Sequence, residues 1–138
     1  MIAYLDSSVL LRALLNQPGQ LSNFKNLTRP IASKLLKPEC LRSLDRLRVR
    51  GHLDELNFIK ASEELYAALD SIEFIEIDHR ILERVGSSFP LPLGTLDAIH
   101  LASALLWRET FDISIDFLTH DEELGKVARA LGFQVFGC

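Results

Sequence analysis

The sequence predicts an α/β fold with a mainly parallel β-sheet and helices on both faces. Short apolar segments of strand length alternate along the 138 residues with longer segments whose apolar residues recur at helical spacing. Hydrophobic residues make up 48% of the chain, enough to bury one core. We therefore expect residues 1–138 to form a single domain.

Five segments have the length and apolar character of buried or half-buried strands. Residues 1–5 form an apolar run that ends at Asp6, and residues 113–118 alternate in part between apolar and polar side chains. In chain order, the expected strands are residues 1–5, 29–33, 74–77, 113–118 and 134–136.

Helices are expected between these strands, and capping residues predict where they begin. Ser7 or Ser8 can cap the first helix. Pro38 suits the first position of the next helix, and Thr95 can cap a long apolar one. In chain order, the expected helices cover residues 7–15, 38–50, 54–68, 81–85, 95–108 and 124–131, with a short, weakly indicated helix before Lys25.

Composition and charge narrow the classes of function. A formal net charge of −4 and a pI of about 5.5 argue against a domain that holds nucleic acid by bulk positive charge. No apolar run reaches the roughly 18 residues that span a bilayer, and no basic region precedes the first apolar stretch as in a signal peptide. Cys40 and Cys138 are expected to be free thiols. We therefore expect a cytoplasmic protein.

Four acidic residues follow expected strands or begin expected helices: Asp6, Glu39, Asp97 and Asp121. In α/β folds such positions converge at the carboxyl ends of the strands. A helix N-terminus stabilises a carboxylate by only about 0.3–1 kcal/mol, so crowded carboxylates must take up protons or bind a cation. Oxygen ligands favour Mg²⁺ or Mn²⁺, which support phosphodiester hydrolysis. Each residue alone is also typical of an ordinary helix start.

Four segments resemble, in order, the acidic motifs of PIN-domain nucleases: YLDSSVLLRALL, IASKLLKPECLRSL, GTLDAIHLASA and FLTHDEELGKVARALGF. Their arrangement is similar to that of VapC-like toxins of toxin–antitoxin pairs. The resemblance implies a three-layer α/β/α sandwich and Mg²⁺- or Mn²⁺-dependent cleavage of RNA, with 5′-phosphate and 3′-hydroxyl products. It also implies an antitoxin that places a basic side chain in the acidic site, and a homodimer.

The resemblance assigns the family's four acidic positions to Asp6, Glu39, Asp97 and Asp121. We expect the first three to hold one ion, and the last to complete the site or hold a second, weaker ion. The hydroxyl residue that often precedes the last acidic position is Thr119. Ser8 stands where the family often has Asn, and it can still donate a hydrogen bond to a water on the ion. His120 is bulkier than the family pattern predicts.

The helix predicted to begin at Pro38 suggests a path for RNA. Arg42, Arg46 and Arg50 follow Glu39 on one helical face and can contact successive RNA phosphates. The alternative is a solvated face with a Glu39–Arg42 ion pair that contributes a few tenths of a kcal/mol.

The histidines and one further aspartate carry less information. His100 lies one turn after Asp97, where it can orient a carboxylate or contact RNA. The remaining histidines are expected at the surface: His52, His79 and His120. Whether Asp116, on its expected strand, belongs to the acidic site is left open.

Two other functions stay open. A phosphoryl-transfer domain of receiver or phosphatase type also has an Asp after a strand, but it needs a second acidic residue nearby and a lysine after a late strand. Here Ser7 and Ser8 follow Asp6, and no lysine occurs between Leu118 and Lys126. A non-catalytic PIN-like binding module would keep the apolar framework without the carboxylates, all four of which are present.

Overall fold

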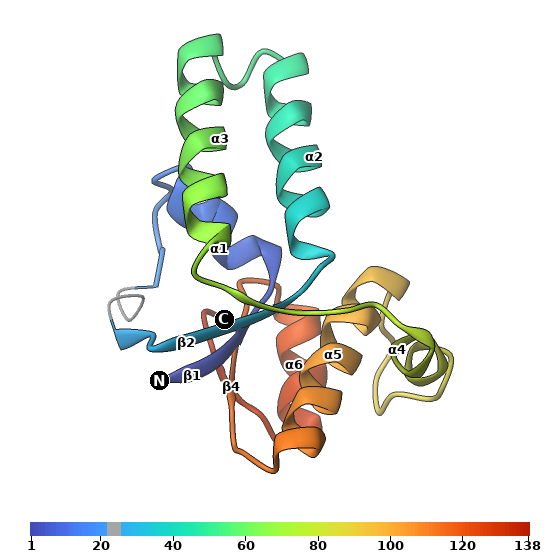
Figure 1. The fold of residues 1–138 in the computed structure, drawn as a ribbon. Helices are drawn as coiled ribbons and strands as arrows, with labels where there is room; N and C mark the ends of the chain where they lie inside the picture. The colour runs from blue at the N-terminus through green and yellow to red at the C-terminus, as the bar shows by residue number, and fades with distance from the viewer. Residues whose placement is uncertain (22–25) are drawn as a thin grey trace.

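The computed structural model describes residues 1–21 and 26–138, which form a five-stranded parallel sheet covered by helices on both faces (Figure 1). The strands are β1 (Ile2–Leu5), β2 (Arg29–Ser33), β3 (Glu73–Ile75), β4 (Asp116–Leu118) and β5 (Gln134–Phe136). The helices are α1 (Ser7–Leu14), α2 (Leu36–Val49), α3 (Glu55–Leu69), α4 (His79–Val85), α5 (Thr95–Phe111) and α6 (Glu122–Ala130). The predicted three-layer α/β/α sandwich is confirmed.

The strand order β3-β2-β1-β4-β5 places β1 in the middle of the sheet. Tyr4 is in register with Ile31 of β2 and Phe117 of β4, and these three side chains share a core with α5 and α6. Successive residues of a strand face opposite sides. Ala3 and Leu5 therefore pack on the other face, where α1 lies. Because β1 is covered on both faces, the residue that follows it is held in a buried position.

The two helical layers differ in character. Nine residues of α5 are buried, so this helix is apolar on almost every side. By contrast, α2 and α3 pack against each other through one face, with Leu44 and Leu65 fully buried between them. The α2–α3 pair projects away from the sheet (Figure 1). Among the described residues, no helix combines the length and the apolar composition needed to cross a bilayer.

Several predicted helix starts are wrong by one or two residues. Asp6 caps α1 in place of Ser7 or Ser8, because its carboxylate accepts the Ser8 amide at 2.9 Å. Helix α2 begins at Leu36, so Pro38 lies within the first turn, where the missing amide hydrogen disrupts no helical bond. Gly94 precedes α5, and Thr95 is its first residue. The short helix expected before Lys25 falls on residues 22–25, outside the described residues.

The predicted strand ends are also corrected. The strand expected at residues 113–118 begins at Asp116, because β5 and β1 offer it only three partners each. Likewise β3 spans Glu73–Ile75 and not residues 74–77, in register with the end of β2. As the first residue of β4, Asp116 lies at the amino end of the sheet, away from the carboxyl ends of the strands.

Candidate active site

The carboxyl ends of the two central strands bring the first site residues together. Asp6 follows β1 and Thr119 follows β4, and the Asp6 amide donates a hydrogen bond to the Leu118 carbonyl at 3.2 Å. Asp6 is 4% exposed and Thr119 is fully buried. The carboxylate of Asp6 is therefore removed from bulk water and depends on protein donors.

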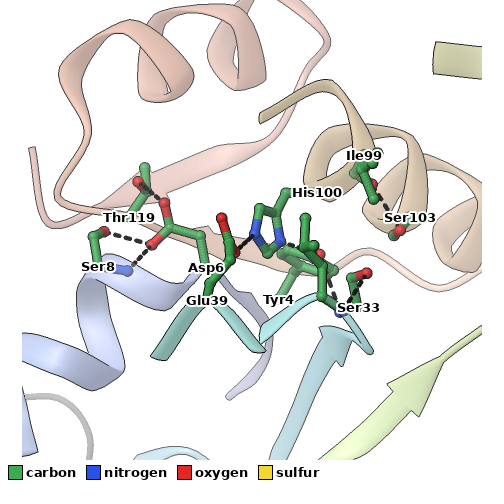
Figure 2. A network of polar contacts seen from close by, with 10 residues as sticks. Tyr4, Asp6, Ser8, Ser33, Glu39, Ile99, His100, Ser103 and Thr119 are labelled. Carbon is green, nitrogen blue, oxygen red and sulfur yellow. Dashed lines mark hydrogen bonds and ion pairs between the residues drawn. The ribbon is translucent and has the colours of Figure 1, made fainter. Parts of the chain in front are cut away.

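Three donors reach the Asp6 carboxylate (Figure 2). Its Oδ1 accepts hydrogen bonds from the amide and the hydroxyl of Ser8, and its Oδ2 accepts one from the Thr119 hydroxyl at 2.6 Å. The two hydroxyls are themselves held, since Ser8 Oγ accepts the His120 amide at 2.9 Å and Thr119 Oγ1 accepts the Asp121 amide at 2.9 Å. The turn after β4 thus fixes the orientation of Asp6.

Glu39 is oriented by a second set of contacts (Figure 2). It lies in the first turn of α2, and its Oε1 is 2.5 Å from Nε2 of His100 in α5. The other ring nitrogen of His100 is 2.7 Å from the Tyr4 hydroxyl, which also accepts the Ser33 amide at 3.1 Å. His100 therefore contacts a carboxylate of the candidate site, one of the two roles expected from the sequence.

Asp97 and Asp121 lie at the starts of α5 and α6. Asp97 is half-buried, whereas Asp121 is exposed. Asp121 caps α6, because its Oδ1 accepts the Leu124 amide at 2.9 Å. Asp121 therefore lies at a helix start, as the sequence predicts.

The pKa values show that the four carboxylates share one electrostatic environment. Burial raises the pKa of Asp97, and the charges of Asp121, Asp6 and Glu39 raise it further. Burial also raises the pKa of Asp6, although the hydrogen bonds from Ser8 and Thr119 oppose that increase. Chain segments that are distant in sequence therefore place like charges close enough to disfavour ionisation.

The negative field extends into the core beneath the site. Burial, and then the nearby charges of Glu39 and Asp6, raise the pKa of the Cys40 thiol to about 12. The pKa of Tyr4 is raised by burial first and by the same two carboxylates to a smaller extent. A crevice with this potential favours a bound cation.

The donor set would suit a hard divalent ion, because it consists of carboxylate oxygens. Within residues 1–21 and 26–138, no three His, Cys, Asp or Glu side chains are close enough to form a ready-made metal cluster. Mg²⁺ keeps several of its waters in proteins, so ligands arranged more widely than a closed cage can still hold it.

One expectation is corrected, and two questions that the sequence left open are answered. His120 is only partly exposed: its Nδ1 lies 2.8 Å from the Gly137 carbonyl and its Nε2 is buried, so it is not a surface residue. Arg42 lies 3.7 Å from Asp45, and Glu39 contacts His100, so the Glu39–Arg42 pair does not form. The strand position of Asp116 separates it from the site.

Sequence reasoning missed Tyr4 and Gly137. A tyrosine within a buried apolar strand needs a partner for its hydroxyl, and this was an available signal. Gly137 has a φ of 110°, and a Cβ there would overlap the Thr119 carbonyl. Only glycine allows this approach of β5 to the turn after β4. No sequence pattern indicated that contact.

The features expected of a phosphoryl-transfer domain are missing from the described residues around Asp6. Lys126, the first lysine after β4, is exposed on α6 and pairs with Glu123 at 3.0 Å. The residues that contact Asp6 are hydroxyl-bearing. This arrangement disfavours the receiver or phosphatase alternative.

The chain is similar in sequence and in fold to known proteins. The chain is 29% identical over 136 residues to Ribonuclease VapC46 of Mycobacterium tuberculosis, covering 96% of this chain and 94% of that protein. The fold is similar to a toxin–antitoxin complex from Klebsiella pneumoniae, with a TM-score of 0.66, 17% identity and coverage of 94% of this chain and 92% of that one.

A second similar structure is VapBC2 from Rickettsia felis bound to a DNA fragment from its promoter. The TM-score is 0.67 at 12% identity, over 98% of this chain and 97% of that one. The family profile described as PIN domain matches residues 3–130, which include the candidate site and all but the last strand. The chain belongs to the PIN domain family.

Proposed function

We propose that residues 1–138 form a single metal-dependent endoribonuclease domain that acts as the toxin of a toxin–antitoxin pair. Membership of the PIN domain family supports a nuclease. The similarity to Ribonuclease VapC46 covers nearly the whole of both chains, which supports RNA as the substrate. The similar folds that come from toxin–antitoxin complexes support the toxin role.

The observation that carries the proposal is the placement of four acidic residues where strands end and helices begin: Asp6 after β1, Glu39 in the first turn of α2, Asp97 in the first turn of α5 and Asp121 at the cap of α6. Burial raises the pKa of Asp97, and the charges of the other three carboxylates raise it further. Natural proteins rarely maintain such repulsion unless it serves function. A non-catalytic module would gain stability by losing one of these charges, so their retention favours an ion-binding site.

We assign roles from burial and contacts. Asp6, Glu39 and Asp97 would hold one Mg²⁺ or Mn²⁺, and Asp121 would complete the site or hold a second ion. When bound, such an ion makes water a better nucleophile and offsets charge on the phosphate. Ser8 and Thr119 fix the Asp6 carboxylate, so its free lone pairs point in a defined direction. The partly exposed Asp97 carboxylate can orient the attacking water in line with the scissile bond.

A groove leads from the acidic site along α2. Its volume is about 440 Å³, within the range of small-ligand sites, and its lining includes Glu39, Arg42 and Arg46. Leu35 and Leu96 add apolar surface beside Glu39. We propose that the RNA strand leaves the scissile phosphate along this groove, with a base against the leucines and phosphates near the arginines.

The arginines have the freedom that this role needs. Arg42 is 76% exposed and makes only a long ion pair with Asp45. Within the described part of the chain, Arg46 and Arg50 form no ion pair, and both are exposed. Their guanidinium groups therefore need not break strong protein contacts to bind phosphate.

The RNA path is tested by salt dependence. Arg46→Ala should weaken binding of single-stranded RNA and reduce the slope of log K against log salt by about 0.7. Lys60→Ala removes an exposed cation from α3 and serves as the control. Equal slopes for wild type and Arg46→Ala would remove Arg46 from the RNA path.

We further propose a protein partner and a homodimer. The crevice at Asp97 and Asp121 is acidic and partly open, which suits the basic side chain of an antitoxin. Cytoplasmic location stays a prediction from the sequence. Mass measurement of the purified protein, alone and with its antitoxin, tests both assemblies.

The activity itself is tested with purified protein and RNA. We expect cleavage with Mg²⁺ or Mn²⁺, none with chelator, and 5′-phosphate ends on the products. Asp97→Asn, which keeps the shape of the side chain, should abolish cleavage. Cleavage by Asp97→Asn at the wild-type rate, or undiminished cleavage in chelator, would refute the proposed chemistry.

A further inference from the structure

We infer that Tyr4 and His100 are positioning residues that hold Glu39 in the orientation needed to bind the metal ion. The inference rests on the proposed function, because it concerns a carboxylate proposed as a metal ligand. It gives a role to Tyr4, which begins the first acidic motif but has no assigned function there and does not line the groove. The connection runs from the end of β2 through β1 and α5 to the first turn of α2 (Figure 2).

The hydrogen bonds have a consistent direction along this connection. The Ser33 amide can only donate, and it donates to the Tyr4 hydroxyl at 3.1 Å. With the hydroxyl hydrogen of Tyr4 directed to Nδ1 of His100, 2.7 Å away, Nε2 carries the ring hydrogen. That hydrogen is donated to Oε1 of Glu39 over 2.5 Å. Each ring nitrogen of His100 therefore has one defined partner.

Burial makes this arrangement rigid. Tyr4 is completely buried, and its ring stacks on Phe117 with centroids 5.2 Å apart. His100 is 1% exposed and meets the edge of the Tyr4 ring. The side chain of Glu39 is 21% exposed, so its outer part faces the crevice. A flexible glutamate is thus held at one oxygen by a fixed ring, while no described residue donates a hydrogen bond to the second oxygen.

Ligand orientation of this kind is a general feature of metal sites. Groups that hydrogen-bond to a ligating residue fix its geometry, and their loss typically lowers metal affinity 10–100-fold. Hydrogen bonds from Ser8 and Thr119 orient the Asp6 carboxylate in the same way. For Glu39, the His100–Tyr4 pair provides this orientation.

Two amide substitutions distinguish the contact at Nε2 of His100 from the contact at Nδ1. In His100→Gln the side-chain nitrogen can reach the position of Nε2 and keep the bond to Glu39. In His100→Asn the shorter side chain can satisfy Tyr4 but cannot reach Glu39. The two variants are similar in polarity, so they form a matched pair. Thermal unfolding of each, without metal, reports the purely structural cost.

The readout is Mn²⁺ binding by calorimetry, which needs no RNA cleavage. We expect His100→Asn to weaken Mn²⁺ binding about 10-fold or more, and His100→Gln to weaken it less than about threefold. Tyr4→Phe, which removes one hydroxyl, should fall between them and gives a further variant should His100→Asn fail to fold. If the Mn²⁺ affinities of the variants correlate with their unfolding temperatures, and not with whether the side chain can reach Glu39, the inference is overturned.

A double-mutant cycle identifies the residue through which His100 acts. In a Glu39→Gln background, His100→Asn should have no further effect on Mn²⁺ affinity, because the carboxylate it orients is already gone. The same loss in both backgrounds would overturn the assignment. Wild-type protein that binds no Mn²⁺ would instead refute the proposed metal site itself, and this outcome is distinct from both.

Discussion

The candidate site has two parts that differ in how the protein holds them. The anchored pair, Asp6 and Glu39, receives hydrogen bonds from buried or half-buried side chains. The open pair, Asp97 and Asp121, lies at helix starts, and among the described residues no side chain donates a hydrogen bond to either carboxylate. The anchored pair is therefore arranged before any ion binds, whereas the open pair keeps oxygens free for ion, water or a basic partner.

The comparison predicts that both pairs matter for cleavage but that only the anchored pair contributes favourably to stability. Asp6→Asn and Asp121→Asn should each reduce RNA cleavage more than about 100-fold. Asp6→Asn should also lower the free energy of unfolding by about 1–3 kcal/mol, because an amide nitrogen cannot accept the bonds that Asp6 accepts. Asp121→Asn should change it by less than about 0.5 kcal/mol, since Asn is also a good N-cap.

These values can be measured by cleavage assays and by denaturant unfolding of the metal-free protein. An Asp6→Asn variant as stable as wild type would show that the carboxylate is not anchored as described. A large loss of stability in Asp121→Asn would remove the distinction between the two pairs.

Gly137 packs against Thr119, whose hydroxyl donates a hydrogen bond to Asp6 of the anchored pair. Its substitution by alanine would force a Cβ against the Thr119 carbonyl at a φ unfavourable for other residues. We expect Gly137→Ala to destabilise the protein by about 2–3 kcal/mol. Gly51 is a matched control, because it also has a positive φ, of 75°, but open space around it. Similar losses at both positions would mean that backbone strain alone, without the Thr119 contact, accounts for the effect.

Asp97 should show the opposite relation between stability and activity. Asp97→Asn removes a charge that Asp121, Asp6 and Glu39 repel. We expect the metal-free variant to be more stable than wild type by about 0.5–2 kcal/mol while being inactive. Unfolding curves without metal test this, and a less stable variant would contradict the proposed repulsion.

The smallest expected effect is on the pH dependence of stability. The pKa of Asp97 is raised above its ordinary value of 3.8, so between that value and the raised one the folded state binds more protons than the unfolded state. This group therefore contributes stability at low pH that is lost as pH rises. Glu73 and Asp78 have lowered pKa values and act in the opposite direction.

The contribution of Asp97 is isolated by comparing two proteins. The stability of wild type relative to Asp97→Asn should decrease as pH rises above about 4. Mn²⁺ should reverse this trend, because it binds the ionised carboxylates and stabilises the folded state. A stability difference that stays constant with pH would show that the pKa of Asp97 is not raised in the folded protein.

The succession of helices and strands along the chain could be predicted from the sequence, because periodicity is local. The spacing of Leu124, Val127 and Ala128 predicts α6, and all three are buried. Boundaries were less accurate. The ends of β4 depend on how many partners β1 and β5 offer, and this is a property of the assembled sheet.

The four carboxylates were predicted as a candidate set, because strand ends and helix starts converge in this fold class. Their connections were not. Tyr4 and His100 are 96 residues apart, and nothing in either local sequence shows that their side chains meet. His120 was expected at the surface because the Gly137 carbonyl that it contacts is also distant in the sequence, just after β5.

The position of β1 has a consequence for synthesis on the ribosome. This strand emerges early, yet one of its neighbours is β4, whose pairing residues 116–118 emerge much later. Contacts across such a separation form slowly and require the later segment to be available. A nascent chain shorter than about 120 residues therefore lacks both the partner strand and the Thr119 hydroxyl. The growing chain therefore cannot assemble the candidate site until most of its message has been translated.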